Sequence, residues 1–429
     1  MKILTAFAAL FCITAAVEAK TIRVPGDFAT IAAAIQSASD GDTILLAPGN
    51  HPQSATVNIN KAVTIASGFL QTNDKTDIEK TIISPAGRQM AEWVILSGKG
   101  ARVIGITFRG SDEHTLNITA GFASVWDCRF LGGKDQLSFT GGGGHVARCY
   151  FENAGDDAID CDNSISWTVE DNMIVNAHQD GLEVRLHPKG GPLTSHIFRH
   201  NRVIGSGQSG IQMIDYQGNS FREFSIHNNV FIGCNGSGVS CMYQEKDNSN
   251  EVYRGSLMEE RAHIYNNTFD GCNYGLTMAP HLIVLNNVFA NLRTRGIGRG
   301  TYITDSVDRS IVDYCLFFNN PLHFDPGIKR GSHILVDLDP RLNQLHELLE
   351  GSPCIDAGQA NYAWDGGAVT IPVIGYRGAA PDLGAIEYQA GKRSGARAEH
   401  EQCRAQVLPP GKRTLSSVKS WYKSKGRPR

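Results

Sequence analysis

One pattern of apolar and polar positions recurs along the middle of the chain. Each copy reads apolar, any, any, Asn or Cys, any, apolar, and consecutive copies start between 20 and 38 residues apart. The eight copies start at Val125, Val146, Val169, Phe198, Ile226, Ile264, Val284 and Val312. A minimum spacing near 20 residues, lengthened by variable insertions, is typical of a solenoid in which each repeat forms one coil.

A second apolar alternation follows each of the first six copies about ten residues later. It begins at Leu137, Ile159, Leu182, Ile211, Val239 and Leu276. Alternation with period two, bounded by glycine-rich turns, predicts short strands. Parallel strands normally need a helical crossover, and a coil of this length has no room for one. The pattern therefore predicts an all-β fold, a single-stranded right-handed parallel β-helix.

The fourth position of the repeated pattern predicts a buried column of side chains. Amides stacked in such a column can hydrogen-bond to one another and to the turn backbone inside an apolar coil. A small buried thiol fits the same place. The column contains Cys128, Cys149, Asn172, Asn201, Asn229, Asn267, Asn287 and Cys315. We interpret these residues as structural.

The N-terminal residues predict an export signal followed by a cap. Residues 1–19 combine a lysine, a short apolar run and small residues, which predicts a cleaved signal peptide and a secreted, periplasmic or cell-surface protein. The stretch from Asp27 to Ala38 fits a short amphipathic helix that would cover the open first coil, after which residues 41–49 enter the first strand. No later apolar run is long enough to span a membrane.

Composition and charge divide the remainder into a β-helix domain, residues 20–388, and a basic tail, residues 389–429. From Gly391 to Arg429 there are eleven Lys and Arg against two Glu, a surplus of nine, so the rest of the chain must carry −12 to reach the net charge of −3. We expect this tail to be flexible and to tether the protein to an anionic surface rather than to bind nucleic acid. Hydrophobic residues make up 41% of the chain, which excludes a wholly disordered protein. We expect a monomer.

Carboxylates gather on three consecutive coils of the predicted helix. Equivalent positions on adjacent coils lie about 4.8 Å apart, so these acids must take up protons or bind a cation. Oxygen ligands favour a hard ion, calcium before magnesium. The predicted ligands are Asp135, Asp156, Asp157, Asp160 and Asp180. The alternative is an acidic strip in solvent-exposed turns without a bound ion.

Basic side chains follow the acids directly. Arg185, Lys189 and His178 are the predicted catalytic residues, and Glu183 and His187 are predicted to contact substrate. Such a site suits an acidic polysaccharide, from which a base would remove the proton next to a sugar carboxylate. Arg185 could instead form an ion pair with the acid at position 162 of the neighbouring coil. Lys189 and His187 could lie in a solvated loop.

The opening segment and the repeats together resemble secreted β-helix proteins of the pectate-lyase-like superfamily. The motif Asp156-Asp157-Ala-Ile-Asp160, with Asp135 one coil earlier, resembles the calcium site of β-helix pectate lyases. This resemblance implies that these four acids hold calcium and that a later lysine is the base, for which Lys189 and Arg185 compete.

A weaker resemblance is to polygalacturonase-type hydrolases. Asp135, Gly155-Asp156-Asp157 and His178 have similar spacing to the acids and histidine of that family, whose Arg-x-Lys signature is missing here.

These observations predict a secreted lyase that cleaves a uronic-acid polymer by calcium-assisted β-elimination. One alternative is a non-catalytic extracellular carbohydrate-binding or surface protein. A second is a polygalacturonase-like glycoside hydrolase.

Overall fold

The computed structural model describes residues 18–87, 92–96, 100–163, 165–216, 218–244, 251–252, 256–299, 309–364, 369–372 and 375–391. The predicted signal peptide lies outside the described residues except for its last two positions, and so does the basic tail from residue 392 onward. The chain divides into two compact units, Met1–Tyr388 and Gln389–Arg429. The β-helix belongs to the first unit.

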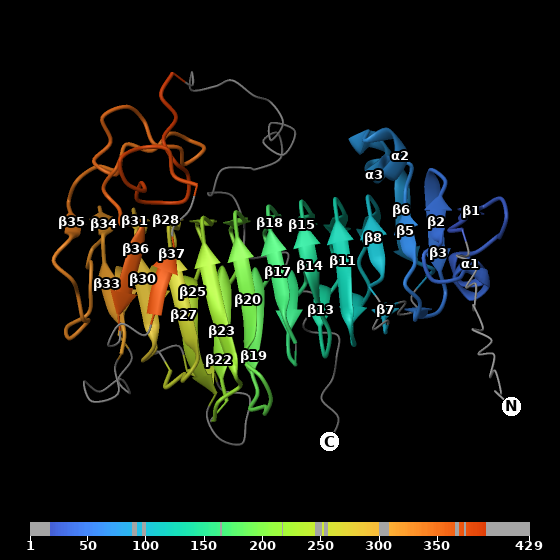
Figure 1. Cartoon of the computed structure of the whole chain (residues 1–429), viewed down its shortest axis with the longest axis horizontal. Coiled ribbons are helices and arrows are strands. Elements are labelled where there is room, and N and C mark those ends of the chain that lie inside the picture. The colour runs from blue at the N-terminus through green and yellow to red at the C-terminus, as the bar shows by residue number, and fades with distance from the viewer. Residues whose placement is uncertain are drawn as a thin grey trace, which may run out of the picture. The chain divides into compact units, whose positions relative to one another are not determined.

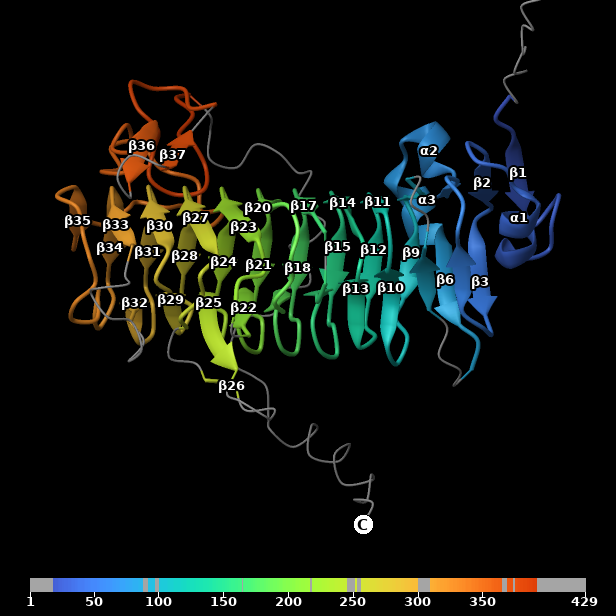
Figure 2. The same cartoon turned by 60° about the horizontal axis from the view of Figure 1, so that its bottom comes forward.

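Three parallel sheets run the length of this unit, and each complete coil contributes one strand to each sheet (Figures 1 and 2). Sheet A consists of β1 (Thr21–Val24), β2 (Thr43–Leu46), β5 (Thr64–Ala66), β8 (Arg102–Ile104), β11 (Phe122–Trp126), β14 (Gly143–Ala147), β17 (Trp167–Glu170), β20 (Thr194–Arg199), β23 (Arg222–His227), β27 (Arg261–Tyr265), β30 (Leu282–Leu285) and β33 (Ile311–Asp313).

Sheet B consists of β3 (Gly49–Gln53), β6 (Thr81–Pro85), β9 (Thr107–Arg109), β12 (Arg129–Leu131), β15 (Tyr150–Glu152), β18 (Met173–Val175), β21 (Arg202–Ile204), β24 (Val230–Ile232), β28 (Thr268–Asp270), β31 (Val288–Ala290), β34 (Cys315–Phe318) and β35 (Ile334–Val336). Sheet C consists of β4 (Val57–Ile59), β7 (Trp93–Ile95), β10 (His114–Ile118), β13 (Asp135–Phe139), β16 (Ile159–Cys161), β19 (Leu182–Leu186), β22 (Ile211–Asp215), β25 (Ser237–Gln244), β29 (Tyr274–Thr277) and β32 (Arg295–Gly298). Among the named strands of the described ranges, antiparallel pairing is limited to β26 (Glu251–Val252) on β25 and to the pair β36 (Asn361–Trp364) and β37 (Val369–Pro372).

The strand register confirms the predicted parallel β-helix. Val125 pairs with Val146, and Val146 pairs with Val169, as the recurring pattern requires. The pairing of Phe198 with Ile226 holds across a longer insertion. Each copy of the pattern spans the end of a sheet A strand, a tight turn and the start of a sheet B strand. The second alternation forms sheet C.

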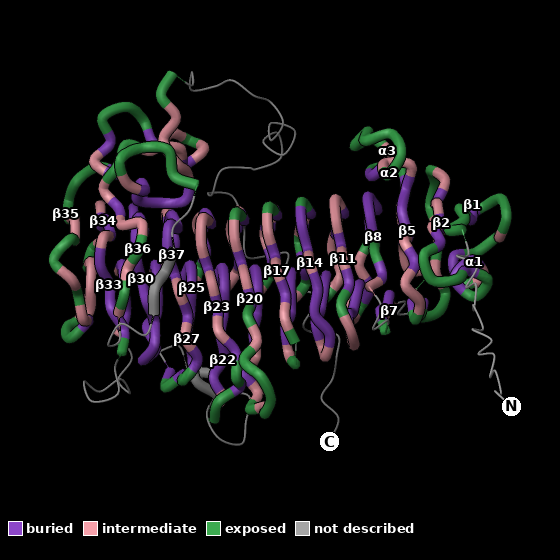
Figure 3. The backbone as a smooth tube through the Cα atoms, in the orientation of Figure 1, coloured by how far each residue is buried: buried purple, intermediate pink, exposed green. Residues whose placement is uncertain are grey.

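The core lies inside the coils, where buried residues line all three sheets (Figure 3). Phenylalanines of sheet B stack from coil to coil, with ring centroids 4.6 to 5.1 Å apart. The stacked residues are Phe108, Phe130 and Phe151 on one run and Phe231, Phe269, Phe289 and Phe317 on another. Burial of these rings and of the aliphatic side chains opposite them is the main apolar stabilisation of the coils.

The asparagine column is confirmed as a hydrogen-bonded ladder. Asn229 Oδ1 accepts from the backbone N–H of Asn201 at 2.9 Å and from its side-chain amide at 3.1 Å. The Asn229 amide in turn donates to Phe198 O at 2.8 Å and to Asn267 Oδ1 at 3.0 Å. The ladder therefore pairs polar groups that the turn would otherwise bury without partners.

The N-terminal cap is present but shorter than the sequence predicts. Helix α1 (Ile31–Ser37) starts after Thr30, whose hydroxyl accepts from the N–H of Ala33, so the predicted first turn from Asp27 is not helical. The first strand, β1, precedes this helix instead of following it. Two further helices, α2 (Phe69–Thr72) and α3 (Lys75–Lys80), were not predicted. No helix among the described residues has the length and apolarity needed to cross a bilayer.

The C-terminal segment lies along the flank of the later coils, not across the end of the stack (Figure 2). Asn266 donates to Asp382 O at 2.8 Å, and Asn286 donates to Gln359 O at 3.0 Å. Leu383 packs with Leu316 and its neighbours in a small separate core. The C-terminal segment is therefore held against the turns that carry the asparagine ladder.

The ladder predicts a large and specific loss of stability on truncation. Asn229→Ala leaves the N–H groups of Asn201 without their acceptor inside the core, so we expect the free energy of unfolding to fall by about 3 kcal/mol. Guanidinium titration followed by far-ultraviolet circular dichroism measures this change. Asn361→Ala, at an exposed position, is the control, and equal midpoints for the two variants would contradict the structural role of the ladder.

Candidate functional site

Two columns of polar side chains share the outer face of sheet C. The first passes through Asp135, Asp157 and Asp180, and the second through Ser138, Asp160 and Glu183. If side chains alternated strictly along each strand, the acids of the first column would point into the coil, as Leu137 does. The strand bends at its entry, however, and the residue after each acid points into the coil, as Gln136 does when its amide donates to Gly132 O at 3.1 Å.

Glycine permits the same bend two coils later, at Gly181. A Cβ atom on Gly181 would lie 2.6 Å from Gly210 O and 2.7 Å from a methyl group of Val203. The inward position therefore excludes a side chain, and Asp180 is turned outward beside it. This local backbone geometry brings acids from both columns onto one face.

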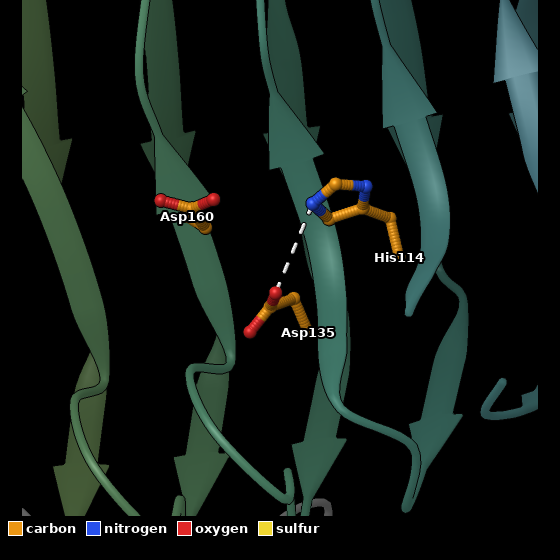
Figure 4. A group of neighbouring side chains, drawn as sticks. All are labelled: His114, Asp135 and Asp160. Atoms are coloured by element: carbon orange, nitrogen blue, oxygen red, sulfur yellow. Dashed lines mark ion pairs between the residues drawn. The ribbon is translucent and has the colours of Figure 1, made fainter. Parts of the chain in front are cut away.

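The first group of acids gathers around His114 (Figure 4). Ligand atoms of His114, Asp135 and Asp160, from β10, β13 and β16, lie within 4.8 Å of one another. His114 Nε2 is 3.8 Å from Asp135 Oδ2, and its Nδ1 is 3.1 Å from Glu92 Oε1. The imidazole thus links carboxylates on both sides.

The second group is a buried carboxylate triad one coil further along. Oxygens of Asp157, Asp180 and Glu183 lie within 4.8 Å of one another, and each residue is at most 4% exposed. Burial and the charges of Asp180 and Glu183 raise the pKa of Asp157 well above its usual value. Asp157 Oδ1 also accepts the N–H of Asp180 at 2.8 Å, and Asp180 Oδ1 accepts the N–H of Ser209 at 2.6 Å. These acids therefore hold adjacent coils together and also concentrate negative charge.

Arg185 lies between the two groups. Its Nη2 is 2.5 Å from Glu183 Oε1, and its Nη1 is 3.1 Å from Asp162 Oδ1 and 3.8 Å from Asp160 Oδ1. Burial alone would lower the pKa of Arg185, but the charges of Glu183, Asp160 and Asp162 outweigh burial and raise it. The neighbouring carboxylates therefore hold Arg185 in its charged form. The ion pair with Asp162 that the sequence left open is present.

Asp160 has an unusual acidity for a carboxyl group. Burial, together with the charge of Asp162, raises its pKa to about 7 even though Arg185 opposes the shift. Asp156 lies apart from both groups, 3.9 Å from Lys134 Nζ, and its pKa is raised by burial and by Asp135. The five predicted ligands thus lie on one face. Asp135 and Asp160 belong to the first group, Asp157 and Asp180 belong to the triad, and Asp156 belongs to neither.

Of the other predicted basic residues, His178 lies near the acids, whereas Lys189 and His187 lie in the loop after β19. His178 is exposed beside Asp156. Lys189 donates to Thr194 Oγ1 at 3.3 Å in the loop after β19, where burial and the charge of Arg222 lower its pKa. The ring of His187 lies against Tyr216, with centroids 4.1 Å apart.

Buried Arg222 connects this loop to the acidic face. Its guanidinium donates to Asp162 O at 3.2 Å and to Arg185 O at 3.4 Å. Lys189 thus lies near Arg222, which is hydrogen-bonded to Asp162 and Arg185 at the edge of the acid cluster.

Sequence reasoning missed His114 and Lys134. His114 pairs directly with Asp135 in the strand register, so extending the acid column one coil upstream would have found it. Lys134 Nζ lies 3.7 Å from Asp135 Oδ2 and 3.6 Å from Glu113 Oε2. These charges outweigh burial and raise the pKa of Lys134.

No family model matches this chain, and no curated protein matches it. Among solved structures, pectate lyase Pel9A superposes with a TM-score of 0.56 at 14% identity, over 87% of this chain and 98% of that one. The likeness is one of fold. A PL6 family polysaccharide lyase from Pseudopedobacter saltans gives a TM-score of 0.43 at 13% identity, over 75% of this chain and 94% of that one. The catalytic unit of a GH87 alpha-1,3-glucanase from Streptomyces thermodiastaticus gives 0.48 at 12% identity, over 71% and 65%.

The raised pKa of Asp160 predicts a pH-dependent stability in the presence of a chelator. A carboxyl whose pKa is higher in the folded chain opposes folding once it ionises, so its cost grows as pH rises from about 4 to about 7. We expect Asp160→Asn to remove this cost and to gain up to about 4 kcal/mol relative to the native protein at pH 8 and little at pH 4. Denaturant titrations at several pH values measure the difference. Asp171→Asn, at an exposed turn, is the control, and a pH-independent effect of Asp160→Asn would contradict the assignment.

Proposed function

We propose that the outer face of sheet C around Asp157 is the active site of an exported enzyme that cleaves a uronic-acid-containing polysaccharide by cation-assisted β-elimination. One observation carries the proposal: a buried carboxylate triad, with Asp157 far from its usual pKa, lies beside the guanidinium of Arg185 on the outer face of sheet C. So many carboxylates in one place are stable as anions only when a cation compensates them. Perturbed groups of this kind cluster at functional sites.

The residues present fit calcium. Asp157, Asp180 and Glu183 offer only oxygen atoms, which suits a hard divalent ion, whereas the neighbouring group contains the imidazole of His114. We therefore assign the triad as the ion-binding group, with Asp135, Asp156 and Asp160 as the flanking acids. Calcium bound there would neutralise a sugar carboxylate and so acidify the proton on the adjacent carbon.

Lys189 is the best candidate for the base among the predicted residues. Its pKa is lowered, which favours the neutral amine that accepts a proton, whereas the pKa of Arg185 is raised. The amine takes the proton from the carbon next to the carboxylate, and the electron pair forms a double bond to the next carbon. The bond from that carbon to the glycosidic oxygen breaks, and the oxygen leaves with a proton from water. Arg185, held by Glu183 and Asp162, orients and stabilises the anionic sugar.

Asp160 favours a second candidate function. A carboxyl group with a pKa of about 7 is protonated near neutral pH and suits the general acid of a glycoside hydrolase. A hydrolase yields new reducing ends without a double bond, so the product distinguishes the two reactions. A protein that binds uronate polymers without cleaving them would be a non-catalytic carbohydrate-binding protein.

The cluster predicts that activity depends on Asp157 and on a divalent ion. With a panel of pectate and alginate polymers, we expect new absorbance from an unsaturated product that disappears on adding chelator and returns with calcium. We expect Asp157→Asn to lower the rate at least a hundredfold, because the substitution removes one ligand charge while its Oδ1 can still accept the N–H of Asp180. Asp171→Asn should retain the native rate. An unaffected rate in Asp157→Asn removes the triad from catalysis.

The lowered pKa of Lys189 predicts a rate that rises on the alkaline side of neutrality and levels off below pH 10.5, the usual lysine value. Lys189→Ala should lower kcat by about 10²–10⁴-fold with little change in KM, which is the usual contribution of a general base. Lys75→Ala, on exposed helix α3, is the matched control. A native pH profile in Lys189→Ala would show that another group takes the proton.

A further inference from the structure

A cavity of about 550 Å³ that is lined mainly by polar residues opens on the same outer face of sheet C, several coils beyond the carboxylate triad. Ser237, Tyr274 and Arg295 line it and belong to the column of Asp135, Asp157 and Asp180. Thr277 lines it as well and belongs to the column of Glu183. The face that carries the acids therefore continues without interruption into the cavity.

The distance between the two places is set by the stacking of the coils. Glu183 precedes Thr277 by three coils, through the strands β19, β22, β25 and β29. At about 4.8 Å per coil, the separation is about 14 Å. A sugar unit in an extended polysaccharide is about as long as one coil spacing. A polymer chain with one unit at the triad would thus place a unit two or three positions along in the cavity.

The cavity lining suits a sugar ring that carries a carboxylate. The guanidinium of Arg295 lies over the ring of Tyr274, 5.7 Å from its centroid. Arg295 also forms an ion pair with Asp325, whose second oxygen accepts the N–H of Arg299 at 2.8 Å. Two arginines and one aspartate leave the lining with a net positive charge, opposite in sign to the triad.

Two further features of the lining point to a ligand. Arg295 Nε is buried and has no hydrogen-bond partner among the described residues, although a buried donor normally has one. The hydroxyls of Ser237 and Thr277 lie 3.0 Å apart at the base of the cavity, where each can also bond to a sugar hydroxyl. Aromatic rings bind the C–H face of a pyranose, and guanidinium groups bind carboxylates through two parallel hydrogen bonds.

We propose that this cavity is a remote subsite that binds one uronate unit of the polymer whose neighbouring unit reacts at the triad. The inference rests on the proposed function and extends it. Because the triad repels an anionic polymer until a cation is bound, the net positive cavity supplies the attraction that holds the chain along the face.

Affinity gel electrophoresis tests the subsite without requiring turnover. The native protein, Tyr274→Ala and Tyr150→Ala are run in gels that contain polygalacturonate, alginate or neutral dextran. Tyr150→Ala is a matched control, because the guanidinium of Arg129 lies over the Tyr150 ring at the same 5.7 Å but on sheet B. We expect a uronate polymer to retard the native protein and Tyr150→Ala equally. We expect the dissociation constant of Tyr274→Ala to be at least fivefold higher.

A second substitution guards against misfolding. Tyr274→Leu keeps apolar bulk beneath Arg295 but lacks a flat face, so it should weaken binding as Tyr274→Ala does, whereas Tyr274→Phe should bind like the native protein. Equal retardation of the native protein and Tyr274→Leu overturns the subsite, and so does the absence of retardation by every uronate polymer. Retardation by dextran of equal strength overturns the uronate assignment.

Cleavage assays on the same proteins keep this proposal separate from the proposed function. Cleavage by the native protein with equal retardation in Tyr274→Ala refutes the subsite and leaves the lyase intact. Retardation that depends on Tyr274, without cleavage of any polymer, supports the subsite and refutes the lyase.

Discussion

The in-register stacking of the coils is the constraint on which the rest of this structure depends. Backbone hydrogen bonds between coils align every side chain with its counterpart on the next coil, so like residues form columns about 4.8 Å apart. In the core this alignment is favourable, since rings stack and the Asn ladder satisfies its own polar groups. On the outer face the same alignment is costly wherever three successive coils carry acids. The cost appears as raised pKa values at Asp157 and Asp160.

Partial compensation for that cost explains the arrangement of cations around the acids. Arg185 binds Glu183 and Asp162, Lys134 lies between Asp135 and Asp156, and His114 joins Asp135 to the preceding coil. Asp157 and Asp180 accept backbone N–H groups of the next coil. The raised pKa of Asp157 shows that negative charge is still concentrated at the triad, and this concentration of charge is the physical basis of the proposed function.

The repeated features were predictable from sequence because the same residue pattern recurs on each coil that contributes to a column. Val125 and its seven counterparts located the coils, the Asn column was identified as structural, and the acids of three coils were placed on one face. Features that occur at only one place in the fold were not predictable. The bend at Gln136, which turns Asp135 outward, depends on how one side chain reaches the turn carbonyls. The flank position of residues 381–387 depends on contacts of Asp382 and Gly384 with Asn266 and Asn286, which lie about a hundred residues away along the chain.

Calorimetric titration of the metal-free protein with calcium would show whether the acidic face of sheet C binds a cation. Because Asp157 and Asp160 hold protons more tightly than ordinary carboxyls, binding of an ion must release protons, and the observed heat must change with the ionisation enthalpy of the buffer. We expect one saturable site per chain, with proton release near pH 6 that diminishes toward pH 8. Absence of binding, or binding without any dependence on the buffer, would contradict it.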